Sequence, residues 1–173
     1  MKKILLIIIG IIVVIVIGLI TLPWIIIAIG FASLPNPPMP EIRYGEFPFR
    51  LVYELNGEQI VVEDTIICEF DGIGSNAAVG KHRKWKAHLA NSGGESVLLV
   101  SDDTRKIYCY VGDAEYYMDD ETHPEERPLT PRIYSVKLNK SDMSILSQEE
   151  ILDKYNIKLL SWDFTEPIVN SFN

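Results

Sequence analysis

A long uncharged apolar run near the N-terminus constrains this chain more than any other feature. The run extends from Ile4 to Phe31 and is preceded by Lys2 and Lys3. A helix rises about 1.5 Å per residue and the hydrocarbon core of a bilayer is about 30 Å thick, so about 20 residues are enough to cross it. An isolated span in lipid must satisfy its backbone hydrogen bonds internally, which only a helix achieves. The run therefore predicts a transmembrane helix over residues 4–31.

A cleaved signal peptide is the alternative interpretation of this run, because it also places lysines before an apolar core and small residues after it. Gly30 and Ala32 are such small residues. The apolar core of a signal peptide is about 7–15 residues long, whereas this run is much longer, so we expect the helix to be retained. Cleavage, which would leave a secreted domain, is kept as the alternative.

The charges on the two flanks of the run predict its orientation. Lys2 and Lys3 precede it, whereas residues 32–40 contain no lysine or arginine. Positively charged flanks stay on the cytoplasmic side of a membrane. We therefore expect residues 1–3 to form a cytoplasmic tip, residues 4–31 to lie in the lipid bilayer of the cell membrane, and the C-terminal part to be extracytoplasmic.

Prolines separate the apolar run from the rest of the chain. Four of the six residues 35–40 are proline. Because proline fixes φ and favours the extended polyproline II conformation, this segment predicts a stiff connector. We place a proline-rich spacer at residues 32–45 and one extracytoplasmic domain at residues 46–173.

The part of the chain that follows the apolar run is acidic. After residue 31 it carries 14 basic and 24 acidic side chains, which is a net charge of −10. A domain that binds nucleic acid needs a basic surface to approach the phosphates. The charge therefore disfavours a nucleic-acid partner.

Two cysteines, Cys68 and Cys109, lie in strand-like apolar segments outside the predicted membrane helix. They are either buried free thiols or a disulfide, which an extracytoplasmic location permits. They lack the C-x-x-C spacing of a redox or zinc site. We expect neither a metal nor a cofactor.

Turn signals and alternating apolar residues predict antiparallel β-structure. Asn56-Gly57 is the strongest hairpin signal, because a type I′ turn needs positive φ at both central residues. The two-residue loop would pair Phe47–Leu55 with Glu58–Phe70. Five further strands are expected at Arg83–Leu89, Ser96–Val100, Lys106–Val111, Arg132–Leu138 and Ile157–Phe164.

One short helix is expected among these strands. Ser147 and Glu150 have the spacing of a capping box, the helix would end near Tyr155, and Asn156 is a residue type that adopts a left-handed terminating conformation. Seven short strands with one helix predict a mainly β (α+β) fold, either an antiparallel sheet with the helix packed on it or a small β-sandwich.

The only concentration of basic residues in the domain is a candidate binding surface. It comprises Lys81, Arg83, Lys84, Trp85 and Lys86. In an acidic domain these side chains offer an anionic partner the least repulsion, so we consider an anionic lipid, an anionic polymer or an acidic face of an envelope protein. The alternative is the solvated face of a strand whose charges pair within the domain.

The segment 112–130 is acidic and aromatic. Oxygen-rich loops can hold calcium, but the spacing here matches no EF-hand loop, so an exposed acidic loop is the expected structure. Four tyrosines beside it form either an aromatic binding surface or packing within a sheet. The acidic residues are Asp113, Glu115, Asp119, Asp120, Glu121, Glu125 and Glu126, with His123 among them, and the tyrosines are Tyr108, Tyr110, Tyr116 and Tyr117.

No catalytic residue is predicted. The chain lacks the G-x-S-x-G, H-E-x-x-H and P-loop motifs and contains three histidines, His82, His88 and His123. We therefore expect a membrane-anchored binding or assembly module without catalytic activity, with an extracytoplasmic enzyme of unidentified class as the alternative.

Short segments of the domain resemble a group of uncharacterised bacterial proteins. These segments are Glu46–Phe49 (EFPF), Ile67–Gly72 (ICEFDG), Lys81–Lys86 (KHRKWK) and Ala114–Met118 (AEYYM). They are similar to those of single-pass, membrane-anchored proteins of comparable length. The resemblance implies a location in the bacterial envelope and implies no activity, substrate or site residue.

Overall fold

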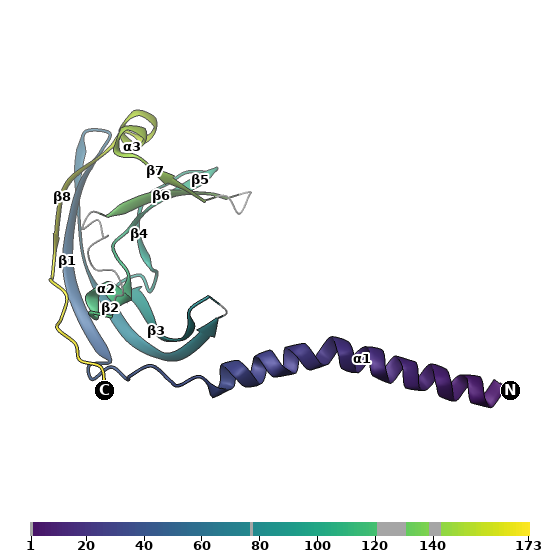
Figure 1. The fold of residues 1–173 in the computed structure, drawn as a ribbon. Helices are drawn as coiled ribbons and strands as arrows, with labels where there is room; N and C mark the ends of the chain where they lie inside the picture. Colours follow the sequence, from purple (N-terminus) through teal and green to yellow (C-terminus); the bar gives the residue numbers. More distant parts are fainter. Residues whose placement is uncertain (1, 77, 121–130, 139–142) are drawn as a thin grey trace. The chain divides into compact units, whose positions relative to one another are not determined.

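A computed structural model describes residues 2–76, 78–120, 131–138 and 143–173 of the chain (Figure 1). The chain divides into two compact units. The first comprises Met1–Pro37 and Ile73–Arg83, and the second comprises Pro38–Gly72 and Lys84–Asn173.

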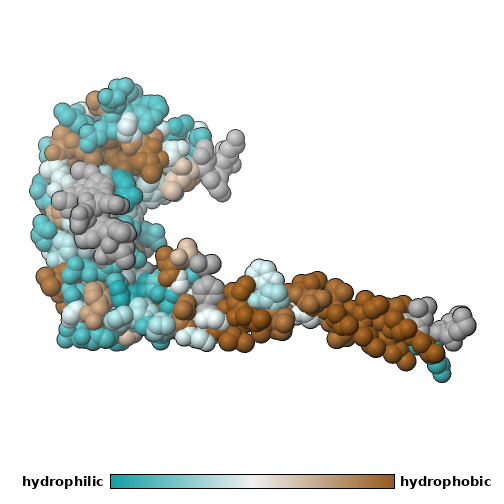
Figure 2. Space-filling view, viewed as in Figure 1, coloured by the Kyte–Doolittle hydropathy of each residue, from teal (hydrophilic) through white to brown (hydrophobic). Residues whose placement is uncertain are grey.

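The first unit contains the apolar run as one continuous helix, α1 (Lys2–Ser33), with Pro23 inside it. The stretch Ile7–Gly30 has a mean hydropathy of 3.0, and none of it is buried in the protein. Hydrophobic side chains cover most of the face of the helix that Figure 2 shows. Thr21 hydroxyl donates back to the carbonyl of Ile17 at 2.9 Å, so this polar group is satisfied within the helix. The helix has the length and composition of a membrane span or of a signal sequence.

The first sheet contains the longest strands, in the order β3-β2-β1-β8. Asn56 (φ 53°) and Gly57 (φ 87°) form the turn between β1 and β2, which confirms the predicted positive φ at both positions. The chain's last strand, β8, pairs antiparallel with its first, β1. The strands are β1 (Tyr44–Leu55), β2 (Glu58–Asn76), β3 (Gly80–Leu89) and β8 (Ile157–Phe164).

The second sheet follows the order of the sequence, β4-β5-β6-β7, with every neighbouring pair antiparallel. The register of β4 against β5 shifts by one residue between Leu98 and Val100, so β4 carries a bulge. The strands are β4 (Ser96–Ser101), β5 (Arg105–Tyr110), β6 (Arg132–Lys137) and β7 (Met143–Leu146).

One hydrophobic core joins the two sheets. Side chains of the first sheet, such as Leu51 and Cys68, belong to the same buried cluster as Ile107 and Cys109 of the second. The hydroxyl of Tyr53 donates to the carbonyl of Leu99 at 3.1 Å, which links β1 to β4 inside the core. Two helices contribute to the cluster, α2 (Ala114–Tyr117) through Tyr117 and α3 (Gln148–Tyr155) through Ile151.

The ends of α3 agree with the sequence. Ser147 and Glu150 form the expected reciprocal capping box, and Asn156 terminates the helix in the left-handed region (φ 51°). The side-chain amide of Asn156 also donates to Asn56 Oδ1 at 3.2 Å, and the backbone N–H of Asn56 donates to the carbonyl of Asn156 at 3.0 Å. The end of α3 and the β1–β2 turn are thereby held together.

The mainly β, antiparallel character is confirmed, but the strand count of about seven is too low. The described residues form eight strands in two sheets, and the additional strand is β7, whose four residues are too few to show a period. The predicted end of the second strand at Phe70 is also wrong, because β2 continues to Asn76. The second helix, α2, falls in the acidic segment that we expected to be a loop.

The second compact unit begins inside the predicted spacer. Met39 and Asn173 exchange two backbone hydrogen bonds of 2.7 and 3.0 Å, and Glu41 N–H donates to the carbonyl of Ser171 at 2.9 Å. Pro40 is fully buried and forms an isolated bridge with Phe172. The end of the chain therefore pairs with the segment that enters the domain.

Candidate functional site

Strand alternation divides the predicted cationic surface. Lys81, Arg83 and Trp85 alternate along β3 with Lys84 and Lys86. Residues two apart in a strand share a face, so the five side chains are split between the two faces of the sheet. Trp85 packs against the core, so Lys84 and Lys86, which alternate with it, lie on the outer side.

The partners of Trp85 and Lys84 show this division. The ring of Trp85 packs against the core and lies 5.3 Å from that of Phe70, and its Nε1 donates to a carboxylate oxygen of Asp120 at 2.6 Å. On the outer side, Lys84 Nζ lies 2.7 Å from Asp71 and lowers the pKa of that carboxyl group. Trp85 is thus a packing residue, and the charge of Lys84 is paired on a solvated face.

Lys81 and Arg83 belong to the compact unit that contains α1. Lys81 Nζ donates to the carbonyl oxygens of Ala32 at 3.2 Å and Leu34 at 2.6 Å, at the end of that helix. The five residues are therefore divided between the two compact units. That they bind an anionic partner together stays a prediction.

The acidic residues that the structure describes contact neighbours in the domain. Asp113 accepts the hydroxyl of Tyr110 and lies 3.6 Å from Arg132. Asp119 accepts the backbone N–H of Asn170 at 3.3 Å. Among the described residues no three His, Cys, Asp or Glu side chains gather as metal ligands. The predicted acidic residues Glu121, Glu125 and Glu126, with His123, lie outside the described residues.

The two cysteines are free thiols buried in the shared core. Cys68 comes from β2 and Cys109 from β5, and both have an exposed fraction of 0%. Burial disfavours the thiolate and raises the pKa of each to about 12. They are neither bridged nor poised as nucleophiles.

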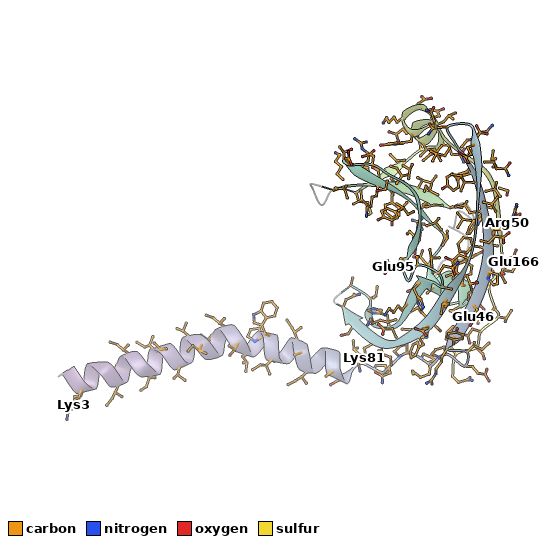
Figure 3. All side chains as sticks on the ribbon, turned by 180° about the vertical axis from the view of Figure 1, so that it is seen from behind. Lys3, Glu46, Arg50, Lys81, Glu95 and Glu166 are labelled. Atoms are coloured by element: carbon orange, nitrogen blue, oxygen red, sulfur yellow. The ribbon has the colours of Figure 1, made fainter. Side chains whose placement is uncertain are left out.

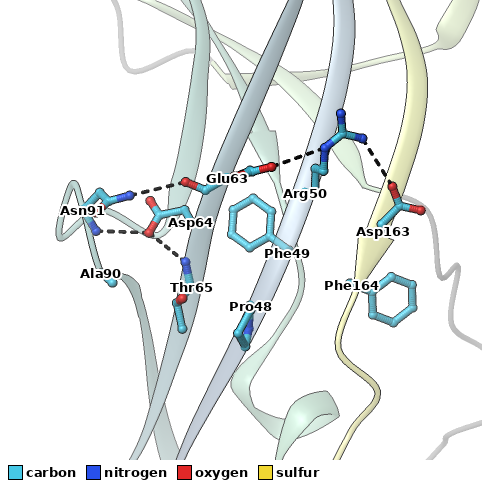
Figure 4. A pocket seen from close by; sticks show the side chains of 10 residues that line it. All are labelled: Pro48, Phe49, Arg50, Glu63, Asp64, Thr65, Ala90, Asn91, Asp163 and Phe164. Atoms are coloured by element: carbon cyan, nitrogen blue, oxygen red, sulfur yellow. Dashed lines mark hydrogen bonds and ion pairs between the residues drawn. The ribbon is translucent and has the colours of Figure 1, made fainter.

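A depression of the domain lies on the outer side of the first sheet (Figure 4). It has a volume of about 600 Å³. Arg50 lies between two carboxylates, with Nε 3.4 Å from Glu63 and Nη1 3.8 Å from Asp163. All three side chains are exposed, and such ion pairs contribute little energy. The depression brings together no nucleophile and base, so we assign it no chemistry.

The outer face of the second sheet is chemically different, because a row of apolar and aromatic side chains crosses all four strands. Leu98 lies opposite Tyr108, Tyr108 opposite Tyr134, and Tyr134 opposite Ile145. We call these four residues the tyrosine row. The two rings stack at 5.4 Å with 20° between their planes. Leu98 is 46% exposed and Ile145 is 68% exposed, so the row reaches solvent at both ends.

Polar contacts hold the tyrosines at the rim of this face in place. Tyr134 hydroxyl donates to Ser96 Oγ at 3.0 Å. The guanidinium carbon of Arg132 lies 5.7 Å from the ring centre of Tyr110. Partial burial and the bond to Asp113 raise the pKa of Tyr110. These contacts fix the positions of the Tyr134 and Tyr110 side chains.

The apolar surface continues around the edge of the sheet. Met143, two residues before Ile145 on β7, is 65% exposed. A groove of about 380 Å³ lies between β7, α3 and β8, and Ile145 borders it together with Leu160 and Trp162. Hydrophobic side chains gather beside α3 in Figure 2. The tyrosine row and this groove form one contiguous candidate site.

Two of the four tyrosines predicted beside the acidic segment lie on this outer face, Tyr108 and Tyr110, and the other two do not. Tyr117 is buried in the core, where its hydroxyl donates to the carbonyl of Val111 at 2.9 Å. Tyr116 is half-buried against it, with the ring centres 5.1 Å apart. Packing thus explains Tyr116 and Tyr117, and for Tyr108 and Tyr110 a binding surface stays a prediction.

Three members of the row, Leu98, Tyr134 and Ile145, were not predicted from the sequence as site residues. The feature that distinguishes them is an apolar or aromatic side chain at a strand position that points to solvent, where a polar side chain is usual. It becomes visible only when the register of β4, β5, β6 and β7 is known.

No protein-family model, curated protein or solved structure matches this chain.

Proposed function

We propose that this chain is a single-pass membrane protein whose second compact unit is a non-catalytic, extracytoplasmic binding module for another envelope protein. The tyrosine row carries the proposal. Soluble proteins rarely expose a contiguous apolar patch without a use for it, and such patches mark interaction sites. The outer side of the first sheet, where Arg50, Glu63 and Asp163 pair in water, lacks this character.

The chemistry of the row fits a protein partner. Tyrosine and arginine are enriched where protein interfaces concentrate their binding energy, because their large rigid groups bury much area at a small entropic cost. Tyr108 and Tyr134 are stacked, and Arg132 lies at the rim. The partner would place apolar side chains on the row and against Ile145.

The membrane role rests on α1. Its 24-residue stretch Ile7–Gly30 is longer than a bilayer requires. None of this stretch is buried against the rest of the protein. Lys2 and Lys3 precede it, so we propose that its N-terminus is cytoplasmic.

Site-specific photocrosslinking in the native membrane tests the binding face. A benzophenone amino acid replaces Ile145 in the full chain, and the same amino acid replaces Val61 as the control. Val61 is also an exposed apolar strand residue (45%), but it alternates with core-packed Ile60 and Val62 and so lies on the outer side of the first sheet.

We expect a discrete crosslinked protein from position 145 and none from position 61. In a chain that also carries Leu98→Lys, at the other end of the row, the adduct should decrease several-fold. Equal crosslinking at the two positions, or no adduct at position 145, would contradict the proposed face.

A further inference from the structure

The tip of the β2–β3 hairpin is attached to the end of α1. Residues Ile73–Arg83 form one compact unit with the helix. Lys81 Nζ donates to the carbonyl oxygens of Ala32 and Leu34 at 3.2 and 2.6 Å. A Cβ placed on Gly80 would lie 3.5 Å from Leu34 Cδ1, so the side chain of Leu34 lies close to the tip. Figure 3 shows Lys3 and Lys81 at opposite ends of α1.

The contact of Lys81 is electrostatically favourable at this position. The last carbonyls of a helix have no partner within the helix, and its C-terminal end carries a partial negative charge. The ammonium group of Lys81 satisfies two of the carbonyls there. No basic side chain of α1 lies in its own last turn, so the hairpin supplies the missing cation.

The position of this contact along the chain determines what surrounds it in a membrane. Ala32 and Leu34 come directly after the apolar stretch Ile7–Gly30. If that stretch fills the hydrocarbon core, Lys81 lies at the level of the lipid headgroups, where lysine side chains are commonly found.

The side chains of the tip suit this environment. Val79 is 66% exposed, although apolar, and it lies in the turn that leads into β3, shortly before the cations Lys81 and Arg83. The part of the chain after α1 has a net negative charge, and these two cations lie close together within it. An apolar tip next to positive charges is the composition of a segment that binds an anionic bilayer surface.

We propose that the tip of the β2–β3 hairpin binds the bilayer surface on the side where α1 ends, with Val79 entering the interface and Lys81 and Arg83 facing anionic phospholipid headgroups. This inference rests on the proposed membrane anchor. It adds a second contact between the protein and the membrane, and that contact depends on lipid charge.

Fluorescence quenching of the full chain in vesicles tests the contact. Val79→Cys is labelled with an environment-sensitive fluorophore, which is selective because Cys68 and Cys109 are fully buried. The vesicles contain phosphatidylcholine and phosphatidylglycerol, with a nitroxide quencher on the headgroup. Val61→Cys, an exposed valine of the other compact unit, is the matched label position.

We expect several-fold stronger quenching at position 79 than at position 61. Quenching at position 79 should weaken in phosphatidylcholine alone and at high salt, because salt screens exposed charges. Arg83→Gln and Lys81→Gln each remove one positive charge from the tip, so both should reduce quenching. Lys158→Gln, which removes an exposed cation from β8, should leave it unchanged.

The outcomes separate this inference from the anchor. The same vesicles are washed at alkaline pH and floated on a density gradient. Protein that is washed off would overturn the anchor and, with it, the hairpin contact. Protein that floats but shows equal quenching at positions 79 and 61, or quenching at position 79 that is insensitive to lipid charge, would overturn the hairpin contact alone.

Discussion

At the scale of single residues, burial determines the ionisation of the two thiols. Cys68 and Cys109 have the same apolar surroundings although they come from different sheets. Burial raises the pKa of each to about 12, from an ordinary value of 9.0. A buried neutral thiol packs as a small hydrophobe and reacts slowly, because the thiolate is the nucleophile.

The thiols predict a specific pH dependence of stability. Below pH 9 they are neutral in both the folded and unfolded states, whereas between pH 9 and 12 they ionise only in the unfolded state. The free energy of unfolding should therefore fall as the pH rises through this window. Denaturant unfolding of the domain at several pH values measures this free energy.

The Cys68→Ala/Cys109→Ala variant is the control. It should be less stable at pH 7 and should lose less stability per pH unit above pH 9. An unchanged slope would contradict the assignment of this pH dependence to the two thiols.

Asn170 is a second residue whose effect comes from burial. Its side chain accepts the N–H of Ile42 at 2.9 Å and donates to the carbonyls of Ile42 and Met118 at 2.9 and 3.2 Å. Asn170→Ala should lower the free energy of unfolding by about 2 kcal/mol or more, because it leaves buried backbone groups without partners. Asn91→Ala, on the exposed surface, should change it by about 0.5 kcal/mol or less. Similar melting temperatures for the two variants would show that the network carries no stability.

At the scale of elements, helices and strands that depend on local signals could be located from the sequence, whereas those that depend on long-range pairing could not. The β1–β2 hairpin and α3 could be located from the sequence because Asn56-Gly57 and the Ser147/Glu150 capping box act over a few residues. The strand β7 could not, because it is short and its identity depends on pairing with β6. The same dependence hides the tyrosine row, whose four members come from four strands.

The β1–β2 turn gives a prediction at this scale. Gly57 has φ 87°, and a Cβ built there meets no atom within 4 Å, so backbone conformation alone opposes a side chain. Gly57→Val should lower the free energy of unfolding by about 1–2 kcal/mol. Gln59→Val places the same side chain at an exposed strand position nearby and should be neutral. Thermal unfolding of the two variants measures the difference, and a value near zero for Gly57→Val would exclude the positive φ.

At the scale of the whole molecule, the pairing of the chain's end with residues 39–41 defines the smallest folding unit. A fragment that starts at Pro38 keeps the bonds between Met39 and Asn173, whereas one that starts at Ile42 loses them. We expect the longer fragment to give a β-rich circular dichroism spectrum and one cooperative transition, and the shorter fragment to melt at a lower temperature. A helix-dominated spectrum, or identical melting of the two fragments, would contradict this account.

The orientation in the membrane is the other prediction for the whole molecule. With Lys2 and Lys3 on the cytoplasmic side, protease added to intact spheroplasts should digest the β domain and leave a short membrane-embedded fragment. Full protection would reverse the orientation. A mature N-terminus near Ser33 would show instead that α1 is a cleaved signal sequence.

The sequence by itself determined the features that act over short distances. The apolar run predicts α1 because the length and apolar character of a continuous stretch can be read directly from the sequence. The hairpin turn and the helix cap follow from residues only a few positions apart. Only the tertiary structure decided the arrangement of eight strands into two sheets, the pairing of β8 with β1, and the composition of each outer face. Those depend on which distant segments align and in which register. A shift of one residue would move the tyrosine row from solvent to core, because strand side chains alternate with a period of two.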